Sequence, residues 1–254
     1  MQKVLGKLTD LLLSKMVNKK VEMNDKSNLK KAIQILFLGN SYTYYNAMPK
    51  KVALMARHCG FSLTCKDHSE DGCCLADLMS EEKVMTDLKQ YEWDFIVLQE
   101  QSQIPVIPDL VQWRMISSIE KILEIKNSDS QIVVFETWAR ENGGIQRIKG
   151  QSSKHFPNFD TMQDEISRVY QTIATKYNLK LAPVGEAWRA AKVLDLPLWL
   201  DDGSHPSVFG SYLAACTLFY TFYQDYGDHI PYYDSLSKQS ATALQEIALY
   251  TVRG

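Results

Sequence analysis

Five short apolar runs, separated by segments with helical periodicity, constrain the fold of this 254-residue chain more than any other feature. Each run has the length of a buried strand. The runs cover residues 33–38, 61–64, 94–98, 131–135 and 179–184. This alternation predicts an α/β fold, a three-layer α/β/α sandwich whose five-stranded parallel sheet is covered by helices on both faces. Its crossovers should be right-handed.

The segments around these runs predict helices near residues 49–56, 75–79, 110–125, 162–177, 206–220 and 235–250. Pro206 is expected at the first helical position of its segment. The helix near residues 110–125 would carry Trp113, Ile116, Ile119 and Leu123 on one face. Residues 140–159 contain three glycines and a proline without apolar periodicity, which predicts a long loop.

The first 31 residues form a separate, basic part of the sequence, with eight Lys and three acidic residues. Their apolar residues recur at helical spacing, which predicts an amphipathic extension before a domain at 32–254. Charged residues interrupt the apolar stretch, so we expect no signal peptide and a cytoplasmic location. Three roles stay open for the extension: packing on the domain, docking to a partner, or association with a membrane surface.

The overall composition argues against several classes of protein. The net charge of −2 gives no reason to expect nucleic acid as a partner, and no run is long enough to span a membrane. An odd number of cysteines, five, argues against a disulfide framework. A zinc site is disfavoured because no C-x-x-C pair occurs in the cluster Cys59, Cys65, His68, Cys73 and Cys74. We therefore expect no metal and no cofactor.

Two polar segments carry the residues needed for nucleophilic catalysis. Ser41 directly follows the first predicted strand, where it is either a nucleophile or an ordinary helix cap. Asp202 and His205 are three residues apart in a turn, a spacing that can place a carboxylate on the imidazole. Asp201 is a rival for the carboxylate. Polar loops follow the first, third and fourth predicted strands, and in an open α/β sheet this edge is where ligands bind.

The same segments resemble the conserved blocks of SGNH/GDSL hydrolases. The stretch Leu-Gly-Asn-Ser-Tyr at residues 38–42 is similar to the family's Gly-Asp-Ser block, with Asn40 in place of its Asp. The stretch Asp-Gly-Ser-His-Pro-Ser at residues 202–207 is similar to its Asp-x-x-His block. The resemblance extends over about residues 33–224, favours a divergent bacterial branch, and implies a flavodoxin-like sheet with Ser41, His205 and Asp202 as a triad.

The resemblance also implies donors for the oxyanion of the reaction. The family supplies a backbone N–H at the position of Gly72 and an Asn side chain after the third strand. This chain has Gln-Glu-Gln-Ser at residues 99–102 instead. Gln101 replaces the Asn by position, and Gln99 is its rival. Around this centre we assign four residues to substrate binding: Asn40, Gln99, Trp138 and Trp199. For the two Trp side chains, packing in the core is the alternative.

These residues predict a serine hydrolase that cleaves small, acetyl-like esters, including esters of carbohydrates. Two alternatives stay open. A non-catalytic flavodoxin-like binding module would keep the fold without the chemistry, as the missing Asn suggests. A lipid-directed hydrolase would use the basic extension as a surface anchor.

Overall fold

The computed structural model describes residues 32–254, which form one compact unit. The predicted amphipathic extension at residues 1–31 lies outside the described residues. The main sheet has the order β2-β1-β3-β4-β7, and all of its strand pairs are parallel. Its strands are β1 (Ile33–Gly39), β2 (Leu63–Ser69), β3 (Phe95–Leu98), β4 (Gln131–Phe135) and β7 (Lys180–Ala182). The predicted five-stranded parallel sheet is confirmed.

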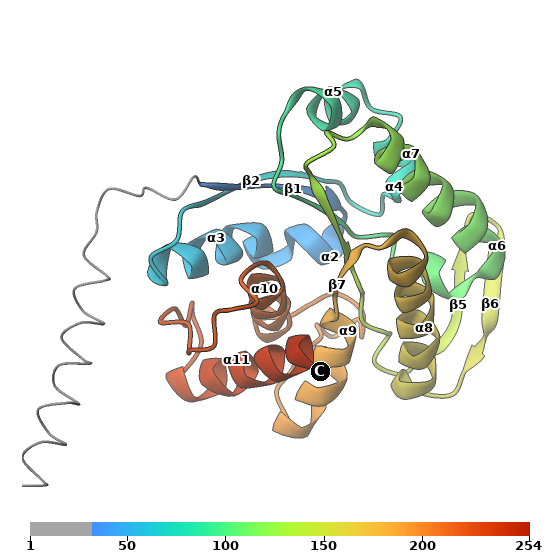
Figure 1. Ribbon diagram of the computed structural model, residues 1–254. Coiled ribbons are helices and arrows are strands. Elements are labelled where there is room, and N and C mark those ends of the chain that lie inside the picture. The colour runs from blue at the N-terminus through green and yellow to red at the C-terminus, as the bar shows by residue number, and fades with distance from the viewer. Residues whose placement is uncertain (1–31) are drawn as a thin grey trace, which may run out of the picture. The chain divides into compact units, whose positions relative to one another are not determined.

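Helices cover both faces of this sheet. Helices α3, α10 and α11 lie on one side, and α5 and α7 lie on the other (Figure 1). The longer helices are α3 (Met48–His58), α5 (Glu82–Gln90), α7 (Ser117–Ile125), α8 (Phe159–Tyr177), α9 (Val184–Ala191), α10 (Val208–Phe222) and α11 (Lys238–Arg253). Two short helices, α2 (Ser41–Tyr44) and α4 (Leu75–Leu78), follow β1 and β2. The predicted three-layer α/β/α sandwich is confirmed.

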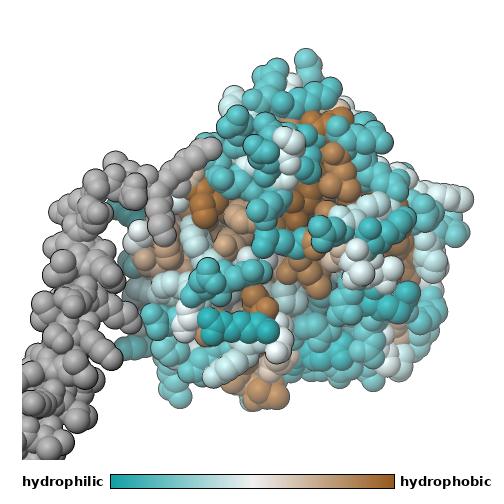
Figure 2. All heavy atoms as spheres, in the orientation of Figure 1, coloured by the Kyte–Doolittle hydropathy of each residue, from teal (hydrophilic) through white to brown (hydrophobic). Residues whose placement is uncertain are grey.

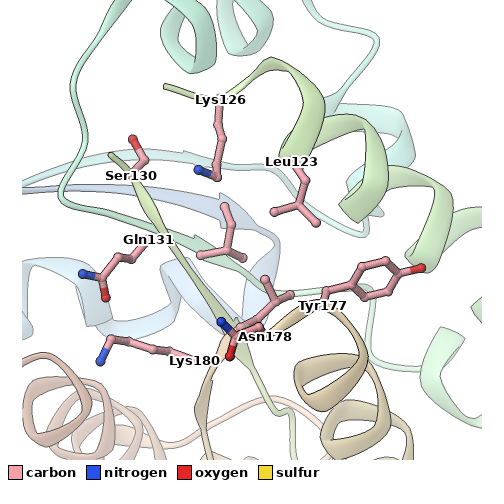
Figure 3. A pocket seen from close by; sticks show the side chains of 9 residues that line it. Leu123, Lys126, Ser130, Gln131, Tyr177, Asn178 and Lys180 are labelled. Carbon is pink, nitrogen blue, oxygen red and sulfur yellow. The ribbon is translucent and has the colours of Figure 1, made fainter. Parts of the chain in front are cut away.

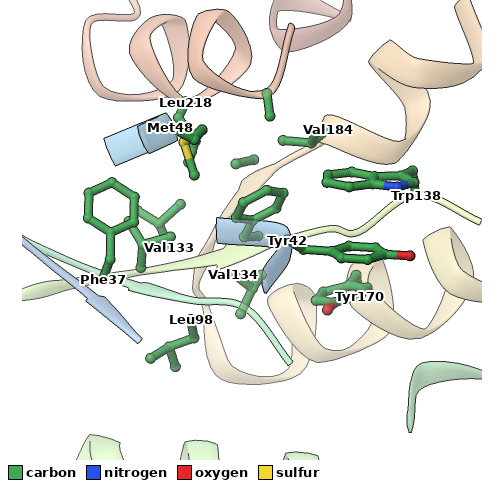
Figure 4. Close-up of a cluster of buried hydrophobic side chains, with 14 of the residues drawn as sticks. Phe37, Tyr42, Met48, Leu98, Val133, Val134, Trp138, Tyr170, Val184 and Leu218 are labelled. Atoms are coloured by element: carbon green, nitrogen blue, oxygen red, sulfur yellow. The ribbon is translucent and has the colours of Figure 1, made fainter. Parts of the chain in front are cut away.

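The core is continuous across the sheet. Figure 4 shows buried side chains of three neighbouring strands on both faces of the sheet, with Phe37 and Val133 on one face and Leu98 and Val134 on the other. Helix α10 is buried along most of its length, so it reads as uniformly apolar rather than amphipathic. The surface in Figure 2 is mostly hydrophilic with smaller hydrophobic areas, as is usual for a globular domain. No helix among residues 32–254 is both long and apolar enough to cross a bilayer.

Several local predictions were wrong. Residues 140–159 are not a plain loop, because β5 (Gly144–Ile148) and β6 (Gln151–Phe156) pair as an antiparallel hairpin. The second strand covers Leu63–Ser69 rather than residues 61–64. The fifth strand ends at Ala182, and helix α9 begins two residues later. These segments are polar or short, so their pairing depends on neighbours that periodicity does not reveal.

Two helices also differ from expectation. The segment before α7 contains α6 (Pro108–Leu110) and the π-helical stretch η3 (Val111–Ile116). The wider π turn changes the rotation per residue, and Trp113 is 69% exposed instead of sharing the buried face. Helix α10 begins at Val208, because Ser207 is the N-cap whose hydroxyl accepts from the backbone N–H groups of Phe209 and Gly210. Pro206 therefore precedes the helix.

Candidate active site

Ser41 is placed by a tight turn at the carboxyl end of β1. Asn40 is the N-cap of α2, and its Oδ1 accepts from the N–H of Tyr42 at 3.2 Å. Its Nδ2 donates to the carbonyl oxygen of Cys73 at 3.0 Å, which ties the Ser41 turn to the loop that carries Gly72. Asn40 is buried, and its two hydrogen bonds hold the two loops together. These bonds give Asn40 a structural role in the turn, and its assignment to substrate contact stays a prediction.

Gln99 supports the same turn from β3. Its Oε1 accepts from the N–H of Asn40 at 2.9 Å and from the hydroxyl of Thr43 at 3.0 Å, and its Nε2 donates to the carbonyl of Glu100. The side chain is fully buried, its amide oxygen accepts two hydrogen bonds, and its amide nitrogen donates one. A Cβ at Gly39 would lie 2.8 Å from the Gln99 Oε1, so only glycine fits this approach. Gln99 is therefore neither an oxyanion donor nor a substrate contact, contrary to its assignment.

Asp202 and His205 come from the turn before α10. Oδ1 of Asp202 accepts from the N–H groups of Ser204 and His205, both at 2.9 Å, and this bonding closes the turn. Its Oδ2 lies 2.5 Å from Nδ1 of His205. Burial alone would raise the pKa of Asp202, but the hydrogen bonds from His205 and Ser204 outweigh it and hold that pKa below its usual range. A carboxylate thus faces the imidazole.

The two segments meet at the carboxyl edge of the sheet. Nε2 of His205 lies 3.1 Å from Oγ of Ser41, although 164 positions separate the two residues in the chain. The order Ser41 Oγ, His205, Asp202 is the arrangement in which an imidazole takes a proton from a serine and a carboxylate orients that imidazole. Asp202, and not the neighbouring Asp201, makes the contact with His205.

Tyr45 was not foreseen from the sequence. Its ring stacks on the imidazole of His205, with centroids 4.6 Å apart and an interplanar angle of 17°. The next two residues, Asn46 and Ala47, both have positive φ, an uncommon conformation that turns the chain sharply. Asn46 secures this bend because its Nδ2 donates to Pro206 O at 3.1 Å and to Ser211 Oγ at 2.8 Å. The bend holds the Tyr45 ring against the imidazole.

Trp138 lies beneath the site rather than in it. Its side chain is 0% exposed and stacks on the ring of Tyr42, with centroids 4.2 Å apart (Figure 4). It also stacks on the ring of Trp188, with centroids 3.9 Å apart. Its Nε1 donates to Ser204 O at 2.9 Å, which supports the His205 turn. For Trp138 the burial agrees with the alternative interpretation, packing in the core. Trp199 is half-buried, and its Nε1 donates to Ala139 O at 3.3 Å.

Two of the expected oxyanion donors, Gly72 and Gln101, have different surroundings. Gly72 has φ +64° and lies on the loop that Asn40 ties to the Ser41 turn. The side chain of Gln101 instead bonds to Gln103, accepting from its N–H at 2.7 Å and donating to its Oε1 at 3.2 Å. The structure therefore brings the Gly72 loop to Ser41 and turns the amide of Gln101 to a neighbour.

Glu100 joins the loops that follow β2 and β3. Its Oε1 accepts from the N–H groups of Leu75 at 3.1 Å and Gln101 at 2.7 Å. The carboxyl is completely buried, which raises its pKa to about 7 despite these two hydrogen bonds. The sequence predicts no role for Glu100, because its contacts with Leu75 and the Gln101 N–H follow no local motif.

The cluster of four cysteines and His68 at residues 59–74 does not form a common site in the described part of the chain. His68 lies 2.5 Å from the carboxylate of Asp87, and Cys65 Sγ contacts the carbonyl of Pro49 at 3.5 Å. All five cysteines of the described domain are free thiols. Within residues 32–254, no group of three His, Cys, Asp or Glu side chains is arranged to hold a metal ion.

A hollow of about 490 Å³ lies at the opposite edge of the sheet. Figure 3 shows Gln131 and Lys180, the first residues of β4 and β7, on its wall. Ser41 follows the last residue of β1, at the other end of the parallel strands. This hollow is therefore separate from the Ser41 site.

Comparisons of the sequence with family models and with curated proteins find no match. Solved structures do match. A protein from Slackia heliotrinireducens, described as an SGNH hydrolase, is 26% identical with a TM-score of 0.59, and the match covers 76% of this chain and 100% of that one. A DUF4886 family protein from Bacteroides uniformis has a TM-score of 0.73 at 19% identity, with 88% and 95% covered.

A protein from Parabacteroides merdae described as a GDSL-like lipase has a TM-score of 0.56 at 18% identity, over 76% of this chain and 97% of that chain. The two matches below a quarter identity bear on the fold, and the Slackia protein adds sequence similarity to it. With the five-stranded parallel sheet of this chain, the similarity to the Slackia protein supports membership of the SGNH/GDSL-type hydrolase superfamily.

Proposed function

We propose that this hydrolase cleaves small acyl esters by acyl transfer through Ser41 to water. The observation that supports the proposal most strongly is the pair of contacts at His205. Its Nε2 lies 3.1 Å from Ser41 Oγ, and its Nδ1 lies 2.5 Å from Asp202 Oδ2. A serine hydroxyl is a weak nucleophile until a base removes its proton, and this arrangement provides that base with a fixed tautomer.

In the proposed reaction, Ser41 Oγ attacks the carbonyl carbon of the ester while His205 Nε2 takes the hydroxyl proton. The tetrahedral intermediate then collapses, and the imidazolium gives its proton to the departing alcohol oxygen. Water attacks the acyl-serine with His205 again as the base, which releases the carboxylic acid and restores Ser41. Asp202 orients His205 and stabilises its charge in both half-reactions.

The backbone N–H groups of Ser41 and Gly72 are the proposed oxyanion donors, and the Asn40–Cys73 bond supports this pairing of loops. In this proposal Gln101 is the third donor, which requires its amide to leave Gln103. One such donor is typically worth about 2.7–4 kcal/mol of barrier. Gln101→Ala should therefore lower kcat by about a hundredfold or more, whereas a loss below about tenfold removes Gln101 from this role.

The direct test is hydrolysis of 4-nitrophenyl acetate by the wild type and by Ser41→Ala. The proposal expects measurable turnover in the wild type and loss of nearly all of it in the variant. Equal rates in both proteins overturn the proposal and favour a non-catalytic binding module. A carbohydrate acetate, assayed by acetate release, tests the finer assignment of the alcohol portion. Of the two Trp side chains assigned to the substrate, Trp199 is the one with exposed surface for a sugar, because Trp138 is buried.

A further inference from the structure

The β5–β6 hairpin and its entry, residues 140–156, carry an excess of positive charge. Arg140, Arg147, Lys149 and Lys154 stand against one acidic residue, Glu141. Lys149 pairs with Asp77 at 3.1 Å, and Lys154 pairs with Glu165 at 3.2 Å. Among the described residues, neither arginine lies within salt-bridge distance of a carboxylate. Two guanidinium charges on this segment are therefore uncompensated.

Arg140 differs from Arg147 because neutral groups hold its guanidinium in place. Nε of Arg140 donates to Oε1 of Gln146 at 3.3 Å, and Nη2 donates to Oγ of Ser102 at 3.2 Å. Both acceptors are buried, and Gln146 is itself fixed by a bond from its Nε2 to Gly143 O at 3.1 Å. Guanidinium has five N–H donors, so most of its donors stay available for another group. The residue is only partly buried, so another group can reach it.

The backbone next to Arg140 contacts the turn that carries Asp202 and His205. The adjacent N–H of Glu141 donates at 2.9 Å to the carbonyl of Gly203, which lies between Asp202 and His205 in their turn. Ser102, which accepts from the guanidinium, is the residue next to Gln101 in the chain. Arg140 thus lies where the segments after β3 and β4 meet the turn that carries His205.

We propose that Arg140 binds a carboxylate carried by the ester substrate, so that the enzyme prefers acidic esters. The inference rests on the proposed esterase function and names its substrate class. A planar guanidinium fork matches a carboxylate in two parallel hydrogen bonds, and its charge-assisted bonds are about twice as strong as neutral ones. A fixed, unpaired guanidinium is already arranged for this contact, and little ordering is needed when substrate binds.

The test compares matched anionic and neutral esters. One pair, 4-nitrophenyl hydrogen adipate and 4-nitrophenyl methyl adipate, places the charge on the acyl side. The other pair, 4-acetoxybenzoate and methyl 4-acetoxybenzoate, places it on the leaving group. For at least one pair, wild-type kcat/KM should be higher for the anion by about tenfold or more, mainly through a lower KM.

Arg140→Met should bring this ratio close to one, and Arg140→Lys should restore part of it, because lysine keeps the charge but loses the fork. Lys154→Met is the matched control: it removes a cation of the same hairpin that already pairs with Glu165, and the ratio should not change. Thermal unfolding of each variant separates loss of recognition from loss of fold.

Wild-type hydrolysis without preference for either anion overturns the assignment of Arg140. An equal fall in kcat/KM for both members of a pair in Arg140→Met also overturns it. Absence of hydrolysis above the Ser41→Ala background with all four esters is a different result, because it refutes the proposed function itself.

Discussion

Gln99→Leu should destabilise the protein and impair the Ser41 turn together. Leucine has similar volume but no polar atoms. The substitution leaves two buried donors without their acceptor, the N–H of Asn40 and the hydroxyl of Thr43, and it removes the donor to Glu100 O. The Thr43 hydroxyl can rotate and carbonyls tolerate loss of one partner better, but the N–H of Asn40 is fixed in the turn.

The size of the effect follows from these groups. An orphaned buried N–H costs about 1–3 kcal/mol, and an ordinary lost hydrogen bond contributes about 0.5–1.5 kcal/mol. One orphaned donor and two weakened groups therefore give a loss of about 2–4 kcal/mol in the free energy of unfolding. Because Asn40 precedes Ser41, the turn should loosen as well, and kcat for 4-nitrophenyl acetate should fall by at least about tenfold.

Urea unfolding monitored by tryptophan fluorescence measures the first quantity, and initial rates under saturating substrate measure the second. Gln131→Leu is the control, since Gln131 is exposed at the start of β4, far from Ser41, and should change stability by less than about 0.5 kcal/mol. A Gln99→Leu protein as stable as the wild type would refute the supporting role derived for Gln99.

Asp202→Asn should lower kcat by at least about a hundredfold, because an amide cannot fix the same imidazole tautomer, while Asp201→Asn stays within about twofold; comparable losses in the two variants would contradict the assignment of Asp202. Tyr45→Ala should lower kcat by about 2–10-fold and Tyr45→Phe by less, since the ring rather than the hydroxyl stacks on His205. Burial raises the pKa of Glu136 to about 7. The unfolded chain releases the Glu136 proton near the ordinary pKa of about 4.5, whereas the folded state keeps it until about pH 7. The free energy of unfolding should therefore fall as pH rises from about 4.5 through 7. Glu136→Gln should reduce the decline in urea midpoint between about pH 5 and pH 8, and an unchanged decline would contradict this account.

The centre of the sheet could be predicted because β1, β3 and β4 are mostly buried. Residues 33–38, 94–98 and 131–135 are apolar enough to mark themselves without knowledge of their partners. The β5–β6 hairpin could not be recognised in the same way, because both of its strands are largely polar and form a sheet of their own. Helix α9 was not predicted because its first residue, Val184, extends the apolar run of the preceding strand.

In the candidate site, local contacts could be predicted from the sequence and long-range contacts could not. The spacing of Asp202 and His205 is local, so the sequence alone predicted their contact. The other contacts of the site join residues that are far apart in the chain. Gln99 lies 59 positions from Asn40, and Trp138 lies 66 positions from Ser204. Ser41 lies 164 positions from His205, on which the ring of Tyr45 also stacks. Residue type alone suggested substrate contact for Gln99 and Trp138, whereas their burial shows that they position the turns on which the site is built.

The central claim is that His205 activates Ser41 as a nucleophile, and covalent labelling tests it most directly. The wild type, Ser41→Ala and His205→Ala are treated with a fluorophosphonate probe, and the site of modification is mapped by peptide mass spectrometry. We predict one adduct, on the peptide that contains Ser41, in the wild type, and nearly none in either variant. An adduct on another residue, or labelling of Ser41 that is as fast without His205 as with it, would contradict the claim.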